Sequence, residues 1–565
     1  MNDRQDGPHD AAAAERFRTT ATRILDALFE ARPVWATELG DHRFDDRMAD
    51  LSAEGGRDYA RMLSDALVAL DALDADRLDP ADQVDLEILR TRLAGEQWTV
   101  TELAPHTWDP LVHLPGDAIY TLLSREPADA GERLRALAAR LRAVPQTLDV
   151  ARETLGTMPR VHVETAIEQA RGVITMLGQD VEPLLEREPS LRAELDPVRR
   201  AAAEAIADHV TWLESRLPGA DRDPRLGAPA YAAKLWYELD TEMTPDKLLT
   251  HAESDLMAVE EQITEAAARV AGGPIEAGRV REVLDGLAGS APVDDRTIVP
   301  LCEAELSRLL EWVRSIGLVT VPDMAVRVVT MPPSRRGVAV AYCDPPGALE
   351  PDGPDGPPET FFAVSPTPAS WSAERVASFY REYNGHVLRS VAIHEAVPGH
   401  AVQLAHARRY RGSTPVRGAL WSNTFVEGWA VYAEELMADV GVSGEDTERD
   451  RAIMELVRLK MRLRSIINAI LDVRVHAHGM TESEAMELMT QRGHQEEGEA
   501  VGKWRRAQLT SAQLATYYVG YREVREIVKE LERHESTEDR CHDLTLSQGS
   551  PPPRHLRTLL GLTGP

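Results

Sequence analysis

The chain has 565 residues, of which 43% are hydrophobic and 28% charged, as in an ordinary soluble globular protein. This length predicts two lobes or one large helical assembly, and the low aromatic content of 5% favours helix over strand. The formal net charge of -30 argues against a broad basic surface for nucleic acid or anionic lipid.

The N-terminus predicts no targeting segment. Residues 1–6 (MNDRQD) are polar, and no run of the chain approaches the roughly 18 apolar residues that span a bilayer. Cys302, Cys343 and Cys541 lie far apart without a CxxC pair, so we expect neither a disulfide framework nor a thiolate metal cluster. We therefore expect a cytoplasmic protein.

The first part of the chain, residues 1–217, predicts an N-terminal helical lobe. Apolar residues recur there at three- and four-residue spacing, which is typical of amphipathic helices. The expected helices cover residues 12–30, 58–73, 81–94, 132–155, 161–185 and 191–217. The Pro- and Gly-containing stretch 218–224 separates this lobe from a second, catalytic lobe at residues 225–565.

The second lobe is expected to be helical except between about residues 318 and 366. A helix should begin at Pro245 with Thr244 as its N-cap. Three short segments rich in Val, Ala and Phe, separated by Pro-containing turns, predict a small β-sheet at residues 318–330, 337–342 and 360–364. Helix returns from about residue 372, and residues 481–484 (TESE) form a capping box.

One segment of the second lobe, residues 391–400 (VAIHEAVPGH), carries the residue types of a metal site. In a helical His-Glu-x-x-His motif, two imidazoles one turn apart bind the metal and the Glu acts as general base. Here His400 follows His394 by six residues rather than four. On a regular helix this spacing would turn the two rings about 120° apart. Pro398 removes a helical amide and Gly399 tolerates unusual backbone angles, so we expect a broken turn that swings His400 back towards His394.

A catalytic zinc ion needs a third protein ligand and an open position. Residues 425–434 (FVEGWAVYAE) offer Glu427 and Glu434, whose spacing puts them on one helix face. We take Glu427 as the ligand. Glu434 is expected either to orient a ligand imidazole or to recognise a substrate amine at the rim of the site.

Two motifs carry a resemblance to a known family: HEAVPGH at residues 394–400, with Gln403 shortly after, and EGWAVYAE at residues 427–434. On these motifs the chain resembles the bacterial DUF885 family, which is similar to gluzincin-type zinc metallopeptidases. The resemblance implies a predominantly α fold with a metal cleft. Weaker matches extend along the chain, at residues 39–46, 108–110, 472–476 and 549–551 and at Arg506, Gln513, Tyr517 and Gly520.

One departure from the family pattern is Ser511-Ala512, where the family often has Pro-Gly, and it changes the expected shape of that loop. The full expectation is a multi-helical, two-lobed metallopeptidase-like fold with a deep cleft and a small β-sheet beside the metal-binding helix. A cleft of this kind would admit short or unfolded peptides rather than folded proteins.

The expected reaction is hydrolysis of an amide bond in a short peptide. One Zn²⁺ per chain would be held by His394, His400 and Glu427, and Glu395 would be the general base. Two His and one Glu suit zinc best, although they do not exclude manganese or cobalt.

Residues late in the chain are expected to complete the site. Tyr517 is the first candidate for donating to the oxyanion and His476 the second, while Tyr518 and Tyr521 compete for the phenol role. The planar guanidinium of Arg506 suits a substrate carboxylate. Packing or surface roles are the alternative for each of these side chains. The residues expected to contact substrate are Arg506, Gln513 and Glu434.

Two other functions stay open. A zinc amidohydrolase acting on a non-peptide amide would use the same metal and base. A catalytically silent metal-binding protein would keep the scaffold, although the intact ligand set and Glu395 argue against it. Partners other than a short peptide or small amide, such as nucleic acid or membrane, are not expected, and the sequence does not predict the oligomeric state.

Overall fold

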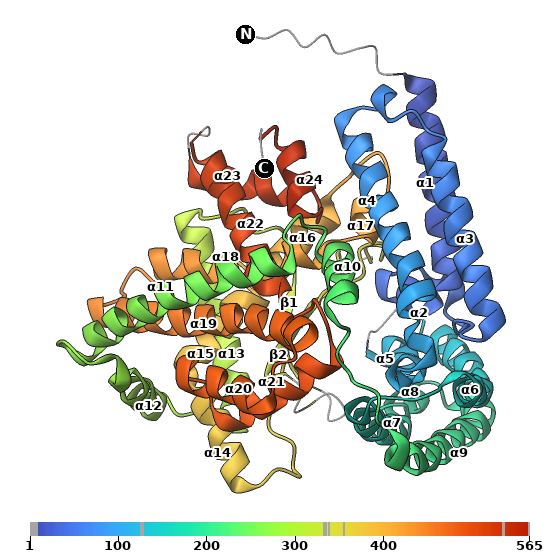
Figure 1. Cartoon of the computed structure of the whole chain (residues 1–565), viewed down its shortest axis with the longest axis horizontal. Coiled ribbons are helices and arrows are strands. Elements are labelled where there is room, and N and C mark those ends of the chain that lie inside the picture. The colour runs from blue at the N-terminus through green and yellow to red at the C-terminus, as the bar shows by residue number, and fades with distance from the viewer. Residues whose placement is uncertain are drawn as a thin grey trace. The chain divides into compact units, whose positions relative to one another are not determined.

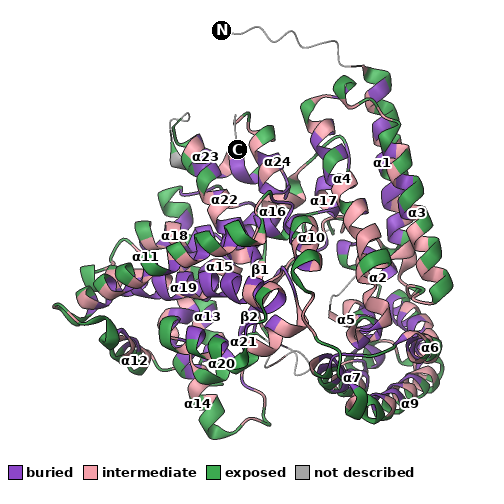
Figure 2. Ribbon diagram, in the orientation of Figure 1, coloured by how far each residue is buried: buried purple, intermediate pink, exposed green. Residues whose placement is uncertain are grey.

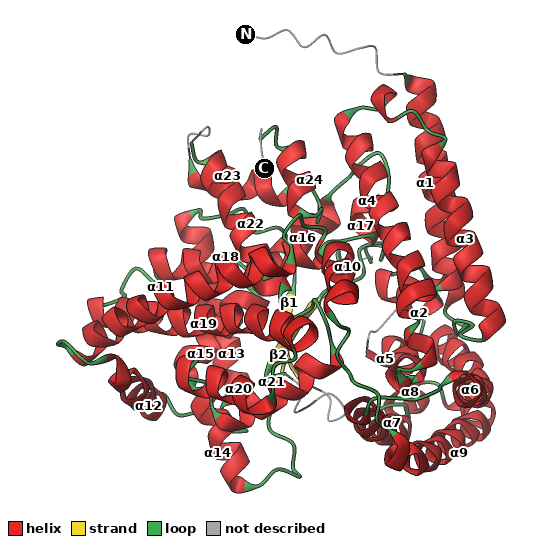
Figure 3. Ribbon diagram, in the orientation of Figure 1, coloured by secondary structure: helices red, strands yellow, loops and turns green. Residues whose placement is uncertain are grey.

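The computed structural model describes residues 10–124, 129–331, 336, 339–353, 356–533 and 537–562, and most of them are helical (Figure 3). The chain divides into two compact units. The first consists of Met1–Pro224, Pro346–Gly356 and Gly412–Ala419, and the second of Arg225–Pro345, Pro357–Arg411 and Leu420–Pro565. None of the helices in the described part of the chain combines the length and the apolar character that crossing a membrane requires.

The first unit is built from amphipathic helices, and Figure 1 shows those of its N-terminal part in blue to teal. In its first helix, Phe17, Ile24 and Leu28 recur at helical spacing and are all buried. The long helices α6 and α9 pack against each other and enclose an apolar core with α7. Its helices are α1 (Ala11–Ala31), α2 (Pro33–Leu39), α3 (Ala53–Asp71), α4 (Pro80–Trp98), α5 (Gly116–Ser124), α6 (Ala130–Thr154), α7 (Arg160–Gln179), α8 (Glu182–Arg187), α9 (Arg192–Arg216) and α17 (Val416–Ala419).

The segment that carries α17 joins the first unit through buried acids of α4. The hydroxyl of Ser413 donates to Asp82, and that of Thr414 donates to Asp85. The guanidinium of Arg417 donates to Asp85 at 2.6 Å, where both side chains are buried. These charged hydrogen bonds explain why a short piece so late in the sequence packs with the N-terminal helices.

The second unit surrounds a long, central helix, α19 (Glu448–His478), which is buried along most of its length (Figure 2). Helix α11 (Pro245–Ala271) runs beside it. The other helices are α10 (Ala228–Leu239), α12 (Val280–Ser290), α13 (Ile298–Ile316), α14 (Ala373–Glu382), α15 (Gly385–Glu395), α16 (His400–Arg409), α18 (Asn423–Val440), α20 (Glu482–Glu487), α21 (Glu497–Leu509), α22 (Thr516–Leu531), α23 (Glu538–Leu546) and α24 (Pro553–Leu559).

A three-stranded sheet lies within this unit, with strand order β1-β3-β2. Strand β3 (Thr360–Val364) pairs in parallel with β1 (Val326–Thr330) and antiparallel with β2 (Ala341–Asp344). Phe362 and Val364 of the central strand are fully buried in the core of the unit. Strand β2 is therefore an edge strand, and it packs against α15.

The predominantly helical fold with one small sheet confirms the composition-based prediction. The Thr244 N-cap and the capping box of Thr481 with Glu484 are both present. Two element predictions were wrong in extent. The helix expected over 161–185 is two helices, α7 and α8, and the strand expected over 318–330 begins only at Val326. The strand expected over 337–342 lies partly outside the described residues, and the described strand there is β2.

Candidate metal centre

The two motif histidines lie on either side of a break between α15 and α16. Helix α15 ends at Glu395 and α16 begins at His400. The rings of His394 and His400 have centroids 4.7 Å apart and planes at 85° to each other. The structure therefore brings together two imidazoles whose spacing would separate them on a regular helix.

The break has a steric cause at Gly399. Its φ of -71° is ordinary, but its ψ of -130° lies outside the α and β regions, in agreement with the unusual backbone angle that the sequence predicted. In addition, a Cβ added to Gly399 would lie 2.0 Å from the carbonyl oxygen of His394. The indole N–H of Trp429 donates to the carbonyl oxygen of Pro398 at 2.9 Å, so α18 also supports the turn. Glycine is needed because the chain folds back onto the end of its own helix.

Glu427 of α18 completes the cluster. Its Oε2 lies 3.4 Å from Nε2 of His394 and 3.5 Å from Nε2 of His400. One ligand atom from each of the three side chains lies within 4.8 Å of the others. The three residues expected to bind metal thus present their donor atoms to one small volume.

A close helix crossing places Glu427. Gly428, the next residue, packs against Gly520 of α22, and a Cβ on Gly428 would meet the backbone of Gly520 at 2.4 Å. On the other side, a Cβ on Gly520 would lie 2.0 Å from the carbonyl oxygen of Thr424. The two helices are among the most closely associated in the protein because glycines occupy their contact.

Glu434 lies beneath the cluster rather than at a rim. Its side chain is 5% exposed, and its Oε1 accepts a hydrogen bond at 2.8 Å from Nδ1 of His394. With the proton on Nδ1, the lone pair of Nε2 points to the side where Glu427 lies. This geometry favours the orienting role for Glu434 over the substrate contact that the sequence also allowed.

The electrostatics of the cluster favour positive charge at its centre. Burial lowers the pKa of His394, but the carboxylates of Glu427 and Glu434 outweigh burial and raise it well above its usual value. Burial raises the pKa of Glu427, but the two histidines outweigh burial and lower it far below its usual range. A cluster of two imidazoles and one ionised carboxylate therefore attracts a proton or a metal cation.

The donor geometry suits a tetrahedral divalent ion. Ligand atoms at about 2.0–2.1 Å from zinc lie about 3.3–3.4 Å from one another in a tetrahedron. The two separations from Glu427 Oε2, 3.4 and 3.5 Å, are close to this value. Within the described part of the chain no N–H or O–H donates to this buried oxygen, which an ion would satisfy.

The carboxylate of Glu395 lies next to this cluster and is held by the edge strand. The backbone N–H of Cys343 on β2 donates to Glu395 Oε2 at 2.9 Å. Glu395 also contributes to the raised pKa of His394, which reflects how near the two side chains are. Sequence reasoning missed Cys343, because a backbone donor leaves no signal in the residue type.

Only one of the three candidate tyrosines faces the cluster. Tyr518 donates to Asp255 at 2.8 Å, and Tyr521 donates to Glu435. Tyr517 lies within electrostatic reach of Glu427 and His394. Burial raises the pKa of Tyr517 first and the Glu427 carboxylate raises it further, so its phenol keeps its proton at neutral pH. The contacts therefore separate Tyr517 from its competitors.

Arg506 forms hydrogen bonds with both Gln513 and Tyr517. The guanidinium of Arg506 donates to Gln513 Oε1 through Nε at 3.2 Å and through Nη2 at 2.8 Å. Nη2 also donates to the hydroxyl of Tyr517 at 3.3 Å. Gln513 is thus brought to Arg506, with Arg506 on α21 and Gln513 in the loop that follows it.

His476 is not brought to the metal cluster. Its ring is 2% exposed, stacks on Tyr231 at 5.7 Å, and donates from Nε2 to the carbonyl oxygens of Ala507 (2.9 Å) and Thr510 (2.8 Å). These contacts bind the end of α21 to α19. These contacts favour, for His476, the packing role that the sequence left open over the oxyanion role.

Asp472, one turn earlier on α19, holds the loop that follows α21. Its carboxylate is fully buried and accepts the backbone N–H of Ala512 at 3.1 Å and of Ala515 at 2.9 Å. Ala512 has a left-handed φ of 65°, a conformation that most residues avoid and that these bonds hold in place. The loop before Tyr517 is therefore fixed by a buried acid that sequence reasoning did not assign to the site.

One comparison with known proteins shows the family, and none of them shows a function. The family described as "Bacterial protein of unknown function (DUF885)" matches residues 33–560. A solved structure of a "putative lipoprotein of unknown function" from Shewanella oneidensis is 26% identical, covers 96% of this chain and 99% of its own, and has a TM-score of 0.78. A "putative lipoprotein" from Colwellia psychrerythraea is 16% identical, covers 97% and 99%, and has a TM-score of 0.79, which shows the fold alone. No curated protein matches the chain.

Proposed function

Since the chain belongs to the DUF885 family, a family of unknown function, we propose from the site itself that it is a metal-dependent hydrolase of amide bonds in short peptides. The observation that carries the proposal is the convergence of His394, His400 and Glu427 beside the carboxylate of Glu395. Three protein ligands with an acid next to them are the arrangement of a catalytic site rather than of a structural metal site, which has four protein ligands.

The metal would be held by His394, His400 and Glu427, with zinc favoured by two imidazoles and one carboxylate. When bound, zinc supplies a Lewis acid that polarises the scissile carbonyl and makes a water more acidic. Glu434 keeps the proton of His394 on Nδ1, so that Nε2 is free to bind.

Glu395 is the general base of the proposal. It takes the proton of the attacking water and gives it to the amine that leaves. Its hydrogen bond from the Cys343 N–H holds one carboxylate oxygen in place. A carboxylate has several acceptor positions, so Glu395 can keep this bond while it accepts a proton.

Tyr517 supports the oxyanion. Its phenol keeps its proton and lies near the cluster, and Arg506 donates to its oxygen, so the phenolic O–H points elsewhere. A donor fixed in this way can stabilise negative charge that develops on the carbonyl oxygen of the substrate.

The edge strand β2 supports a peptide as substrate. Because the N–H of Cys343 points to Glu395, this residue presents its backbone away from β3. Ala341, two residues earlier, presents its peptide groups along the same edge. An extended peptide that pairs with this edge would place its backbone beside Glu395.

A digest tests the proposal. Protein loaded with zinc is incubated with a library of short peptides, and the products are identified by mass spectrometry. Cleavage that stops on chelation and returns with zinc supports the proposal. A protein that binds one zinc per chain and cleaves no peptide would show that the site is not a peptidase site.

A further inference from the structure

We propose that Arg506 recognises a carboxylate group of the substrate, so that the enzyme acts on amides with a negative charge near the scissile bond. This inference rests on the proposed function and names the substrate class of the same site. The shared chemistry is a carboxylate, which a peptide can supply at its C-terminus or from an Asp or Glu side chain.

Among the residues that the structure describes, no acid forms an ion pair with Arg506. The hydrogen bonds described for its guanidinium go to neutral oxygens, of Gln513 and Tyr517. Across the residues that the structure describes, no carboxylate oxygen lies within 4.0 Å of its guanidinium, although the chain carries 93 acidic and only 63 basic residues. In so acidic a protein, a half-buried arginine without a counter-ion is unusual, and a substrate anion would supply the missing charge.

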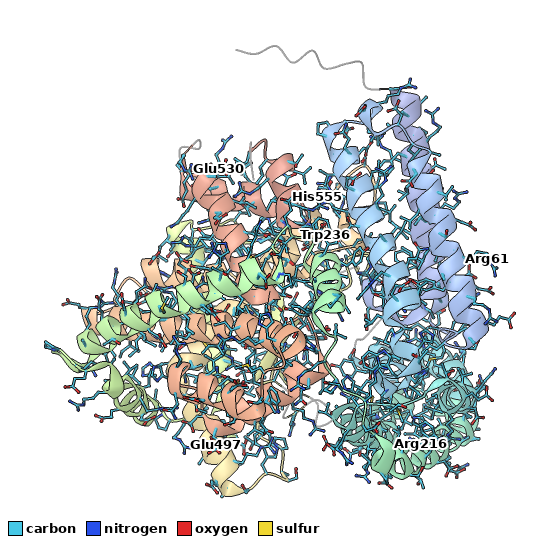
Figure 4. All side chains as sticks on the ribbon, viewed as in Figure 1. Arg61, Arg216, Trp236, Glu497, Glu530 and His555 are labelled. Carbon is cyan, nitrogen blue, oxygen red and sulfur yellow. The ribbon has the colours of Figure 1, made fainter. Side chains whose placement is uncertain are left out.

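Glu499, an acid whose charge reaches Arg506, is paired with other side chains. Lys503, one turn before Arg506 on α21, is 4% exposed and lies 3.8 Å from Glu499. Arg464 also pairs with Glu499. Glu499 is therefore already in ion pairs with Arg464 and Lys503, and Arg506 acts on its carboxylate only from a longer distance. Figure 4 marks Glu497, the first residue of α21, from which this helix can be followed.

The guanidinium is held in one orientation. Gln513 Oε1 accepts from both Nε and Nη2, so it occupies one edge of the planar group. Nη2 also donates to the Tyr517 hydroxyl, so the adjacent edge, formed by Nη1 and Nη2, lies beside that hydroxyl. Gln513 is itself held because Asp472 binds the N–H groups of Ala512 and Ala515 on either side of it. Such preorganisation lowers the entropy that is lost when an anion binds.

The position of Arg506 determines where the carboxylate must lie on the substrate. Tyr517 precedes Gly520 by three residues on α22, so both lie on the helix face that crosses α18. At that crossing Gly428 contacts Gly520, and Glu427 of the metal cluster is the residue before Gly428. Arg506 therefore contacts Tyr517, which itself lies within electrostatic reach of Glu427 and His394. A carboxylate bound there belongs to a residue close to the scissile amide.

The experiment compares binding with turnover. The probes are N-acetyl-trialanine with a free C-terminus, its C-terminal amide, and the amidated peptide with one Ala replaced by Asp. Binding is measured on zinc-loaded Glu395→Gln, in which turnover is blocked, and cleavage on the zinc-loaded enzyme. Each is repeated with Arg506→Gln and Arg506→Lys, and with Arg492→Gln, which removes an exposed arginine paired with Glu260, as the matched control.

We expect at least one carboxylate peptide to bind about 10- to 100-fold more tightly than the neutral amide, as a charged hydrogen-bonded pair would provide. Arg506→Gln should remove this preference and leave the affinity for the neutral amide within about threefold. Arg506→Lys should retain part of this preference, because the lysine ammonium keeps the positive charge but lacks the planar, bidentate geometry of a guanidinium. The free acid and the Asp peptide tell which source supplies the carboxylate.

Other outcomes would overturn the inference. Equal binding of all three peptides by the Glu395→Gln protein would show that Arg506 does not form a carboxylate-binding site. An equal loss of cleavage for charged and neutral peptides in Arg506→Gln would show that Arg506 acts only on Tyr517. Carboxylate-dependent binding without any cleavage would instead keep the site and contradict the hydrolase proposal, so the two failures are distinguishable.

Discussion

The backbone N–H of Cys343 donates to the carboxylate of Glu395 at 2.9 Å, and this bond joins edge strand β2 to the helix that carries His394. The donor belongs to the peptide backbone, so a change of the Cys343 side chain leaves it in place. The sheet thereby fixes the orientation of the acid that we propose as the base. Two predictions follow from how this acid and its neighbour Glu434 are held.

Glu395→Gln should keep its metal and lose turnover. The amide has the same shape and its oxygen can accept from Cys343, but it cannot take a proton from water. We expect peptide cleavage to fall about 10²- to 10⁴-fold, the usual contribution of a general base. Metal analysis and kinetics on the same sample check this, and a variant that retains wild-type turnover with bound zinc would exclude Glu395 as the base.

Glu434→Ala should weaken zinc binding without removing a ligand. Without this carboxylate, the Nδ1–H of His394 loses its acceptor, and the ring is no longer held with Nε2 towards Glu427. Loss of such an outer partner lowers metal affinity by about 10- to 100-fold. A competition titration against a chromophoric chelator measures the affinity. Glu445→Ala, at an exposed position, is the control and should bind zinc as the wild type does. An unchanged affinity in Glu434→Ala would assign Glu434 a role in packing alone.

The sequence predicted those parts of the site that residue type and spacing encode. The interval between His394 and His400, with proline and glycine between them, pointed to a broken turn, and the structure brings the two rings together. Gly399 has the unusual backbone angle that was predicted, a ψ of -130°, and the structure adds that close approach to the His394 carbonyl excludes a side chain there. Local chemistry thus predicted the shape of the turn, although its steric origin required coordinates.

The rest depended on contacts between residues far apart in the chain. Tyr517, Tyr518 and Tyr521 cannot be ranked from sequence, because their roles follow from the distant acids Asp255 and Glu435. His476 fits a catalytic pattern by residue type, yet two carbonyl oxygens occupy its Nε2–H.

The exact ends of the helices and strands could not be predicted from the sequence, because tertiary packing rather than intrinsic propensity determines where short strands and helix breaks occur.

Gly520→Ala should separate α18 from α22. A Cβ at this position would lie 2.0 Å from the carbonyl oxygen of Thr424, and backbone cannot move aside as a flexible side chain can. We expect a loss of stability of about 1–3 kcal/mol from overpacking, together with weaker zinc binding because Glu427 shifts. Urea unfolding and zinc titration measure the two effects.

Gly502→Ala is the matched control for this substitution. Gly502 is a helical, exposed glycine of α21 with open space around its Cβ position. Alanine there should leave stability unchanged or raise it by about 1 kcal/mol, because alanine has the higher helix propensity. If both variants behaved alike, steric contact at Gly520 would not explain how the two helices meet.

Asp472→Asn should change how stability depends on pH. Burial raises the pKa of Asp472 to about 7 in the folded protein, against an ordinary value of 3.8, although the N–H groups of Ala515 and Ala512 oppose the shift. Between about pH 4 and pH 7, the folded protein therefore holds a proton that the unfolded chain releases. Stability from this group is fully present below pH 4 and is lost as pH rises through 7.

The variant cannot titrate at this position, so its stability should lack this decline. Asparagine can accept only one of the two N–H bonds, which destabilises the loop by an amount that does not vary with pH. The free energy of unfolding of the wild type minus that of the variant should therefore decrease from pH 4 to pH 7, while other titrating groups cancel. Urea unfolding of both proteins across this range measures the difference, and parallel curves would mean that Asp472 is ionised in the folded protein throughout.

Turnover of the variant at a single pH then reports whether the loop that Asp472 holds also keeps Tyr517 in place, since a loosened loop lowers kcat while zinc content stays constant.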